Sequence, residues 1–446
     1  MSNIQEHFSK LALNVPEILL PAPHVNLEKW AVIACDQFTS EKEYWQKVDE
    51  YVGDAPSTLR LIFPECYLED TDKEERIKNI QSSMRKYIEK EILKEQERGF
   101  ILVKRDTAHS RTRYGLLVAL DLEHYDFTKG AKTLIRATER TILERIPPRK
   151  AIREGAPVEL PHIMVLIDDP DKTVIEPLVG KKEELKKVYD FDLMMGSGHV
   201  TGYMITEPSL LENIAGALEK LADKRRFKER YGTEDVFLYA IGDGNHSLAT
   251  AKVVWEDLKK EHSQDPGIME HPARWALVEL VNLYDTGLNF EPIHRVVFNI
   301  DYADFFHQLE AGRDFDKIEY FDNPRDMFKE IERKDDTHSI GFMAEDKYGV
   351  LISENPSSPL PTPTIQNFLD SYKSSHTNIS IDYIHGEEAT MKLASKPGNM
   401  GFFLPALDKS KLFKTVMVDG ALPRKTFSMG EADEKRFYVE ARKIVP

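Results

Sequence analysis

The stretch VFLYAIGDGNHSLATAKVVWEDL, residues 236–258, joins an apolar run to an amphipathic segment through two closely spaced glycines. Residues 236–241 are apolar and rich in β-formers, which predicts a short strand buried on both faces. Apolar residues then recur at helical spacing, which predicts a helix over 245–261. Gly242 and Gly244 therefore mark a sharp strand-to-helix turn.

This turn has the features of an anion-binding site. The first backbone N–H groups of a helix lack intrahelical partners and attract anions such as phosphate, and Gly244 lets the backbone approach a ligand closely. Asp243 is a candidate metal ligand or proton acceptor, and His246 and Ser247 are candidate donors to phosphate oxygens. Asp or Asn before a helix also serves as a simple cap. The local pattern leaves both interpretations open.

Composition restricts the classes of function. The chain has 446 residues, enough for two or three domains, and a formal charge of −16, which argues against a nucleic-acid binder. It has two cysteines, no signal-like N-terminus and no apolar run long enough for a bilayer. We expect a cytoplasmic globular protein with no membrane or nucleic-acid partner. Its partner would be a small-molecule substrate, and a homo-oligomer is compatible with the sequence.

Strands and helices alternate irregularly, which predicts an α/β or mixed α+β fold. We expect a main α/β domain over 1–300 carrying the turn, and a C-terminal α+β portion over 301–446 packing on the site. Residues 145–157 and 355–364 are rich in proline and predict an exposed loop and a connector. Strands are predicted at 30–35, 99–105, 114–122, 162–168, 274–285, 339–345 and 348–353, and further helices at 72–97, 210–221 and 408–418.

The segment RATERT crowds three charged side chains together. Arg136 and Arg140 lie four residues apart, so in a helix they would share a face and could bracket an anionic group. Glu139 lies between them. A surface helix with internal ion pairs is the alternative interpretation of the same spacing.

Further along the chain, EPIHRVVF contains His294 and Arg295, and LPRKTFSMG contains Lys425. Arg and Lys are strong donors to phosphate or carboxylate, whereas a lone His beside a strand is more often structural. The stretch GSGHVTGY, 196–203, lacks the Walker ending and predicts a hairpin or a mobile loop. No GxSxG or HExxH motif occurs.

Several of these motifs resemble, in the same order, those of the microbial family catalogued as domain of unknown function 1015. IGDGNHSLATA is similar to its DGHHR-x-x-x-A signature, ERT at 139–141 to its HERT-like element, and EPIHRVV to its Pro-x-His-Arg-Val segment. IDYIHG and LPRKTFSMG resemble its late elements. The chain departs from the signature at two positions, where Asn245 replaces the first His and Ser247 replaces the Arg.

The strand–Asp-Gly–helix junction also resembles the phosphate loop of the ParB/sulfiredoxin fold, which includes kinases of free serine. This resemblance implies a phosphate-binding unit embedded in a larger mixed-sheet protein, with ATP or ADP bound at the turn. It implies that Asp243 assists Mg²⁺ and that Glu139 is a candidate base. The residues expected to hold the nucleotide are Gly242, Gly244, Asn245, Ser247, Arg136, Arg140, His294, Arg295 and Lys425, with Asp243, His246 and Glu139 as the catalytic candidates.

The leading hypothesis is a nucleotide-dependent kinase that phosphorylates a free hydroxyl of a small molecule, with serine as one candidate. One alternative is a phosphatase or other hydrolase of a phosphorylated metabolite, in which Asp243 and His246 handle water. Another is a non-catalytic ligand-binding or regulatory protein, which the missing Arg at Ser247 favours.

Overall fold

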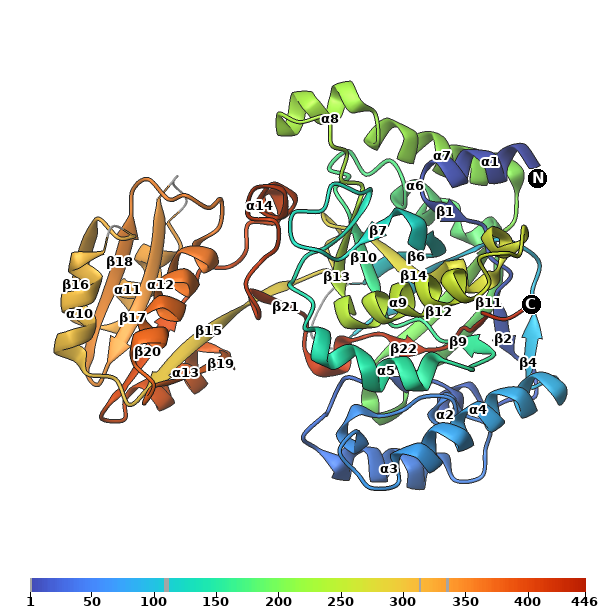
Figure 1. Cartoon of the computed structure of the whole chain (residues 1–446), viewed down its shortest axis with the longest axis horizontal. Helices are drawn as coiled ribbons and strands as arrows, with labels where there is room; N and C mark the ends of the chain where they lie inside the picture. Colours follow the sequence, from blue (N-terminus) through green and yellow to red (C-terminus); the bar gives the residue numbers. More distant parts are fainter. Residues whose placement is uncertain (1, 108–111, 313, 334–336) are drawn as a thin grey trace. The chain divides into compact units, whose positions relative to one another are not determined.

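The computed structural model describes residues 2–107, 112–312, 314–333 and 337–446. The chain forms two compact units, Met1–Asn289 with Gly430–Pro446, and Phe290–Met429 (Figure 1). The first boundary lies close to the expected division at residue 300. The end of the chain differs from that expectation, because Gly430–Pro446 returns to the first unit and pairs two short strands with it.

The first unit is built on a large mixed sheet of order β11–β12–β5–β6–β14–β10–β13–β8–β7, with β1 paired to β6. The pairs β14–β10, β13–β8 and β8–β7 are parallel and the others antiparallel. Its strands are β1 Leu13–Asn14, β5 Phe100–Asp106, β6 Arg113–Asp121, β7 Tyr125–Asp126, β8 Ile135–Ala137, β10 Met164–Ile167, β11 Lys186–Asp192, β12 His199–Ile205, β13 Tyr239–Asp243 and β14 Trp275–Asn282.

Small two-stranded sheets and helices cover this sheet (Figure 1). The pairs are β2 Leu19–Pro21 with β4 Leu93–Glu95, β3 Val32–Ile33 with β22 Phe437–Tyr438, and β9 Val158–Glu159 with β23 Arg442–Lys443. The helices are α1 Ser2–Lys10, α2 Leu27–Trp30, α3 Lys42–Val52, α4 Lys73–Glu89, α5 Ile146–Arg153, α6 Glu176–Val179, α7 Pro208–Leu221, α8 Lys224–Tyr231 and α9 Asn245–Glu261.

The predicted strand-to-helix unit is confirmed. Strand β13 lies between β10 and β8, and Tyr239, Ala240 and Ile241 are completely buried, as expected for a strand covered on both faces. Helix α9 has the predicted bounds and buries the apolar stripe that includes Leu248 and Trp255. The glycine-rich stretch at 196–203 lies at the β11–β12 hairpin, which is one of the two structures expected there.

Three local predictions are wrong. The loop expected at 145–157 contains helix α5, because its prolines lie in the first helical turn, where no backbone N–H is needed. The helix expected over 72–97 ends at Glu89, and the chain reverses at Glu91 with φ of 51° before β4. The RATERT segment begins in strand β8, so Arg136 and Arg140 share no helix face.

Two further predicted boundaries are shifted. The strand expected at 30–35 is reduced to β3, because Trp30 ends helix α2. The connector expected at 355–364 ends earlier, because helix α12 begins at Pro361, again with proline in its first turn. In both cases the sequence pattern did not predict the adjoining helix.

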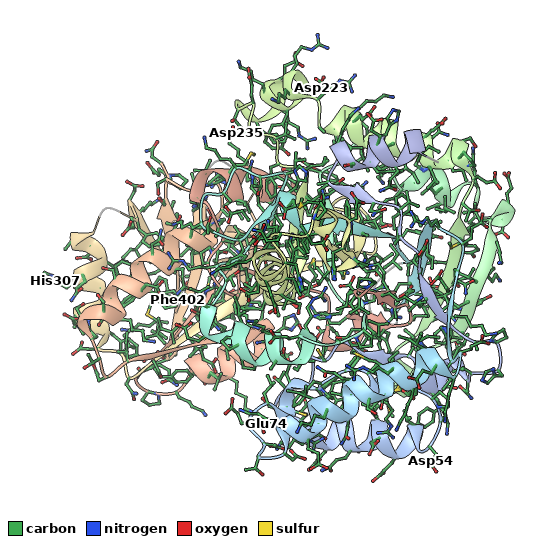
Figure 2. All side chains as sticks on the ribbon, turned by 45° about the vertical axis from the view of Figure 1, so that its right-hand side comes forward. Asp54, Glu74, Asp223, Asp235, His307 and Phe402 are labelled. Atoms are coloured by element: carbon green, nitrogen blue, oxygen red, sulfur yellow. The ribbon has the colours of Figure 1, made fainter. Side chains whose placement is uncertain are left out.

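The second unit packs helices on a sheet of order β16–β18–β17–β20–β15–β19, with β21 paired to β15. Phe402 lies in its core and His307 at its surface (Figure 2). The described helices of both units are all too short or too polar to span a membrane. The elements of this unit are β15 Phe290–Phe298, α10 Tyr302–Ala311, β16 Lys317–Phe321, α11 Pro324–Ile331, β17 His338–Ala344, β18 Lys347–Ser353, α12 Pro361–Ser375, β19 Ser380–His385, α13 Glu387–Ala394, β20 Asn399–Phe403, α14 Leu412–Asp419 and β21 Phe427–Met429.

Candidate functional site

The turn between β13 and α9 requires glycine for two reasons. Gly244 has φ of 84°, a left-handed conformation that side chains disfavour. A Cβ added to it would lie 2.9 Å from Cγ1 and 3.1 Å from Cα of Ile163. The helix then begins without a side-chain cap. The start of this 17-residue helix is therefore a place where backbone N–H groups can receive an anion.

Asp243 ends the strand with its carboxylate held by two donors. Oδ1 accepts the Gly244 N–H at 3.0 Å, and Oδ2 accepts from Lys435 Nζ at 3.1 Å. Burial raises the pKa of Asp243, but the charge and hydrogen bond of Lys435, with a contribution from His162, outweigh it and lower the pKa below its usual value. The carboxylate is thus ionised at neutral pH, which suits it to hold a cation better than to take up a proton.

Asn245 and His246 fix the ERT segment beside the turn. Asn245 Oδ1 accepts the backbone N–H of Thr138 at 3.2 Å, and its amide also donates to the strand backbone. His246 Nε2 accepts the backbone N–H of Ile142 at 3.2 Å. Residues 139–141 are therefore tied at both ends to the first turn of α9. The ERT segment and the DGNHS turn therefore lie beside each other in the structure.

These contacts also determine the protonation of the His246 ring and the role of the Asn245 amide. Because Nε2 of His246 accepts a hydrogen bond, the ring is neutral and carries its proton on Nδ1. Asn245 is only 9% exposed, and its amide supplies both a donor and an acceptor at this position. Within the tied segment, Oγ1 of Thr141 is buried without a hydrogen-bond partner in the described part of the chain.

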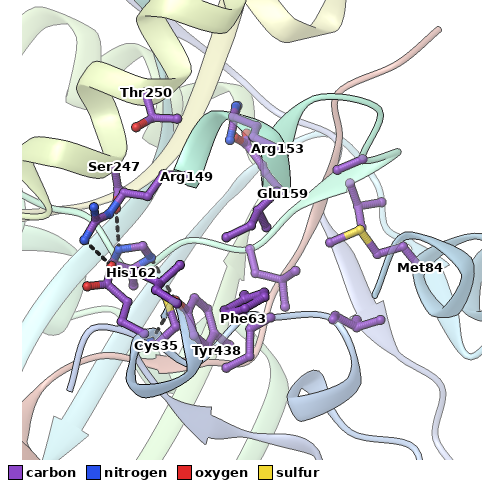
Figure 3. A pocket seen from close by; sticks show the side chains of 18 residues that line it. Cys35, Phe63, Met84, Arg149, Arg153, Glu159, His162, Ser247, Thr250 and Tyr438 are labelled. Atoms are coloured by element: carbon purple, nitrogen blue, oxygen red, sulfur yellow. Dashed lines mark hydrogen bonds and ion pairs between the residues drawn. The ribbon is translucent and has the colours of Figure 1, made fainter. Parts of the chain in front are cut away.

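A second chain of hydrogen bonds starts at Ser247. Its Oγ lies 2.8 Å from Nε2 of His162, and Nδ1 of His162 lies 2.9 Å from the hydroxyl of Tyr438 (Figure 3). That hydroxyl also accepts the backbone N–H of Cys35. Burial raises the pKa of Tyr438 far above its usual value, so the phenol stays protonated. The chain fixes the ring of His162 against the first turn of α9.

A cavity of about 140 Å³ opens beside this chain of hydrogen bonds (Figure 3). Ser247 and Thr250 line it from α9, and His162 lines it from the loop before β10. Cys35 also lines the cavity. Burial raises the pKa of its thiol, so the thiol is uncharged. The remaining lining is mostly aliphatic and aromatic. The polar end of the cavity is thus next to the candidate anion site.

The two arginines predicted for anion binding differ in their surroundings. Arg136 is buried and donates to the backbone carbonyls of Thr133, Asp235 and Val236. Those bonds, rather than an anion, engage its guanidinium. Arg140 is exposed, within the tied ERT segment.

His294, Arg295 and Lys425 belong to the second unit. His294 is buried, its Nδ1 accepts the backbone N–H of Leu404, and burial together with the charge of Arg295 lowers its pKa to about 4. Arg295 is completely buried and donates to Gln366. Lys425 has a positive φ of 56°. A role for these three residues at the turn stays a prediction.

Several residues of the site were not predicted from the sequence. Lys435, His162 and Tyr438 belong to no recognised motif, and Lys435 lies 192 residues from Asp243 along the chain. The only available signal was the position of His162, a polar residue directly before a buried strand.

Within the described ranges, no group of three or more His, Cys, Asp or Glu side chains is arranged to hold a metal ion. Asp243 is thus not part of a preformed cluster of three such ligands in the part of the chain that the structure describes. Mg²⁺ characteristically binds through one or two carboxylates together with substrate phosphates. The donor set accordingly suits a magnesium ion that arrives with a nucleotide better than a permanently bound metal.

Comparisons with solved structures give low similarity. A conserved hypothetical protein from Pyrococcus furiosus is 10% identical, with a TM-score of 0.35, over 74% of this chain and 95% of that chain. A free serine kinase in complex with AMP is 10% identical, with a TM-score of 0.37 and coverage of 74% and 91%. A variant of free serine kinase in complex with ADP is 10% identical, with a TM-score of 0.38 and coverage of 74% and 92%. Similarity at this level establishes neither a shared fold nor a shared activity.

No curated protein sequence is detectably similar to the chain. A family assignment, in contrast, covers most of it. The family described as protein of unknown function DUF1015 matches residues 18–372, a span that includes the ERT segment, the DGNHS turn and the EPIHRVV segment. The chain belongs to this family of unknown function.

Proposed function

We propose that the chain binds the phosphate groups of ATP or ADP at the first turn of α9 and transfers a phosphoryl group to a free hydroxyl of a small molecule. The observation that carries this proposal is the ionised carboxylate of Asp243, held by Lys435 at the uncapped start of a long helix. Backbone N–H groups and an ammonium offer donors to phosphate oxygens, and the carboxylate offers a ligand to Mg²⁺.

The charges of the site match such a ligand. Asp243 would hold a Mg²⁺ that enters with the nucleotide, and the ion would supply neutralisation of the charge on the phosphates. Lys435, now 3.1 Å from that carboxylate, is then available to a phosphate oxygen. Phosphoryl transfer needs positioning and charge neutralisation more than covalent chemistry from the protein. The residues present therefore fit the nucleotide and the cation together.

Glu139 is the proposed base. It lies in the segment that Asn245 and His246 tie to the first turn of α9. In the proposed step, the acceptor hydroxyl oxygen forms a bond to the terminal phosphorus, and the bond from that phosphorus to the leaving phosphate oxygen breaks. The hydroxyl proton passes to the carboxylate of Glu139. The lowered pKa of Asp243 makes its carboxylate poorly suited to accept this proton.

The geometry favours transfer over hydrolysis by His246. Its Nε2 already accepts the backbone N–H of Ile142, so that nitrogen is not available to activate water. Phosphate release that does not depend on any acceptor would nevertheless identify a hydrolase. Nucleotide binding without turnover, unchanged in Asp243→Asn, would identify a non-catalytic binding protein.

Binding is measured by isothermal titration with ATP, ADP, AMP and inorganic phosphate, each with and without Mg²⁺. In a parallel urea-unfolding measurement, a nucleotide at a hundredfold excess over its dissociation constant is expected to raise the free energy of unfolding by about 2.7 kcal/mol. We expect Asp243→Asn to lose the magnesium-dependent part of binding, whereas Asp54→Asn, at an exposed position, keeps it. Absence of binding for every nucleotide overturns the proposal.

A further inference from the structure

The cavity beside the first turn of α9 is mostly apolar. Aliphatic and aromatic side chains from the segment before α4, from α4 and α5, and from β9 make up most of its wall. Most of them belong to one buried cluster of the first unit. The apolar side chains that line the cavity include Leu61, Ile62, Phe63, Met84, Ile152 and Val158.

The charged side chains that line the cavity are already paired. Arg149 lies 2.5 Å from Glu65, and Arg153 lies 2.6 Å from Glu159. The lining therefore contributes two cations and two anions, and each cation holds a carboxylate. A charged ligand would have to break one of these pairs or lose its water without compensation, and both changes are costly in a desolvated site.

One end of the cavity can bond a hydroxyl group. Ser247 Oγ lies 2.8 Å from His162 Nε2 there, and because this bond uses one position of the hydroxyl, Ser247 can still form a further hydrogen bond with a ligand. Ser247 is the third residue of α9, so this end is within one helical turn of the candidate phosphate site. A ligand hydroxyl bound at this end would therefore lie close to the phosphate groups of a nucleotide bound at the first turn of α9.

The volume limits the size of the occupant. The cavity measures about 140 Å³. A dry engineered cavity of roughly 150 Å³ in another protein, lined by Leu, Ile and Phe, binds benzene. A single six-membered ring or a branched aliphatic group of that size therefore matches the space, whereas a purine ring system exceeds it.

We propose that this cavity binds the apolar body of an uncharged alcohol of about one ring in size, with its hydroxyl at Ser247, whose Oγ is held by His162. This inference rests on the proposed phosphotransfer, for which it names the acceptor class. It excludes free serine as the preferred acceptor, because the ammonium and carboxylate of serine would enter a cavity whose charges are paired. Ser247, which replaces an Arg of the family signature, is compatible with an uncharged ligand.

The test titrates the full chain, without nucleotide, with ligands that share one ring: benzyl alcohol, toluene, benzoate and benzylamine, and with L-serine. We expect benzyl alcohol to bind most tightly, roughly threefold to tenfold better than toluene, which is the effect of one net hydrogen bond. Ser247→Ala is expected to remove that preference while toluene binding persists. Tighter binding of serine, benzoate or benzylamine than of benzyl alcohol overturns the inference.

A cavity-filling variant supplies an independent readout. Ala156 lines the cavity and is 3% exposed, so Ala156→Leu is expected to abolish binding of both benzyl alcohol and toluene. Ala131→Leu, a partly exposed position outside the lining, is the matched control. Unchanged binding in folded Ala156→Leu overturns the assignment of the cavity. Because no nucleotide is present, failure here is separate from failure of nucleotide binding, which alone would overturn the proposed function.

Discussion

Replacement of Gly244 by Ala tests whether the turn needs glycine for both conformation and space. An Ala at φ of 84° adopts the left-handed region, which costs about 1–2 kcal/mol. Its Cβ would also lie 2.9 Å from Cγ1 and 3.1 Å from Cα of Ile163. The second contact is with a backbone atom, so relief requires movement of the chain, and overpacking of this kind costs about 1–3 kcal/mol. We expect a total loss of about 2–5 kcal/mol.

Gly232→Ala is the matched control. Gly232 follows helix α8 with φ of 77°, and nothing lies within 4 Å of a Cβ added there. The control therefore carries the conformational cost alone, about 1–2 kcal/mol. The difference between the two variants isolates the contact with Ile163.

Urea unfolding followed by tryptophan fluorescence measures the stability of the first unit, which contains both substituted glycines. The sequence contains 4 tryptophans, and all of them lie in the first unit: Trp30, Trp45, Trp255 and Trp275. The free energy of unfolding is obtained by linear extrapolation to zero urea. If Gly244→Ala loses no more stability than Gly232→Ala, the close approach to Ile163 does not constrain the turn and the reasoning is refuted.

Three further predictions concern the contacts around the turn. Asn245→Ala leaves the buried backbone N–H of Thr138 without its acceptor, so we expect the free energy of unfolding in urea to fall by about 1–3 kcal/mol. Unchanged stability would contradict a structural role for this hydrogen bond. The pKa of Asp243 is lower in the folded chain than in the unfolded chain, so its contribution to stability is present above about pH 4 and is lost as pH falls through the folded pKa. Lys435→Met should reduce the stability that is lost on acidification, so the urea midpoints at about pH 6 and about pH 3 should differ less than in the unmodified chain. An equally large difference would contradict the ion pair between Lys435 and Asp243. Tyr438→Phe removes the hydroxyl at Nδ1 of His162, so the ring ¹⁵N resonances of that residue should shift, and unshifted resonances would show that the two groups are not bonded.

Local chemistry explains why the turn could be predicted from the sequence. Each part of the unit is encoded within a few residues: an apolar run, two glycines at the junction and an amphipathic period that follows. The same local approach failed at 145–157, because prolines in the first turn of a helix and prolines in a loop look alike in sequence. It failed again at RATERT, where spacing suited a helix but β8 pairs with β13.

The rest of the site could not be predicted, because it depends on contacts between distant segments. Lys435 reaches Asp243 only because the last residues of the chain return to the first unit. Tyr438 reaches His162 across 276 residues for the same reason. No periodicity or motif near these residues marks them, and pairings of this kind appear only once the sheet has formed.

The structure gives a physical role to each of the two residues, Asn245 and Ser247, at which the chain departs from the family signature. At the first, the amide of Asn245 accepts the backbone N–H of Thr138 and donates to the carbonyl of Ile241 in β13, for which both a donor and an acceptor are needed. At the second, Ser247 contacts His162 at the mouth of the cavity, where a longer cationic side chain would occupy the space that a ligand needs. With no Arg at that position, the cation beside Asp243 comes instead from Lys435. The small side chain of Ser247 therefore leaves space for a ligand in the cavity, while Lys435 of the C-terminal segment supplies the positive charge beside Asp243.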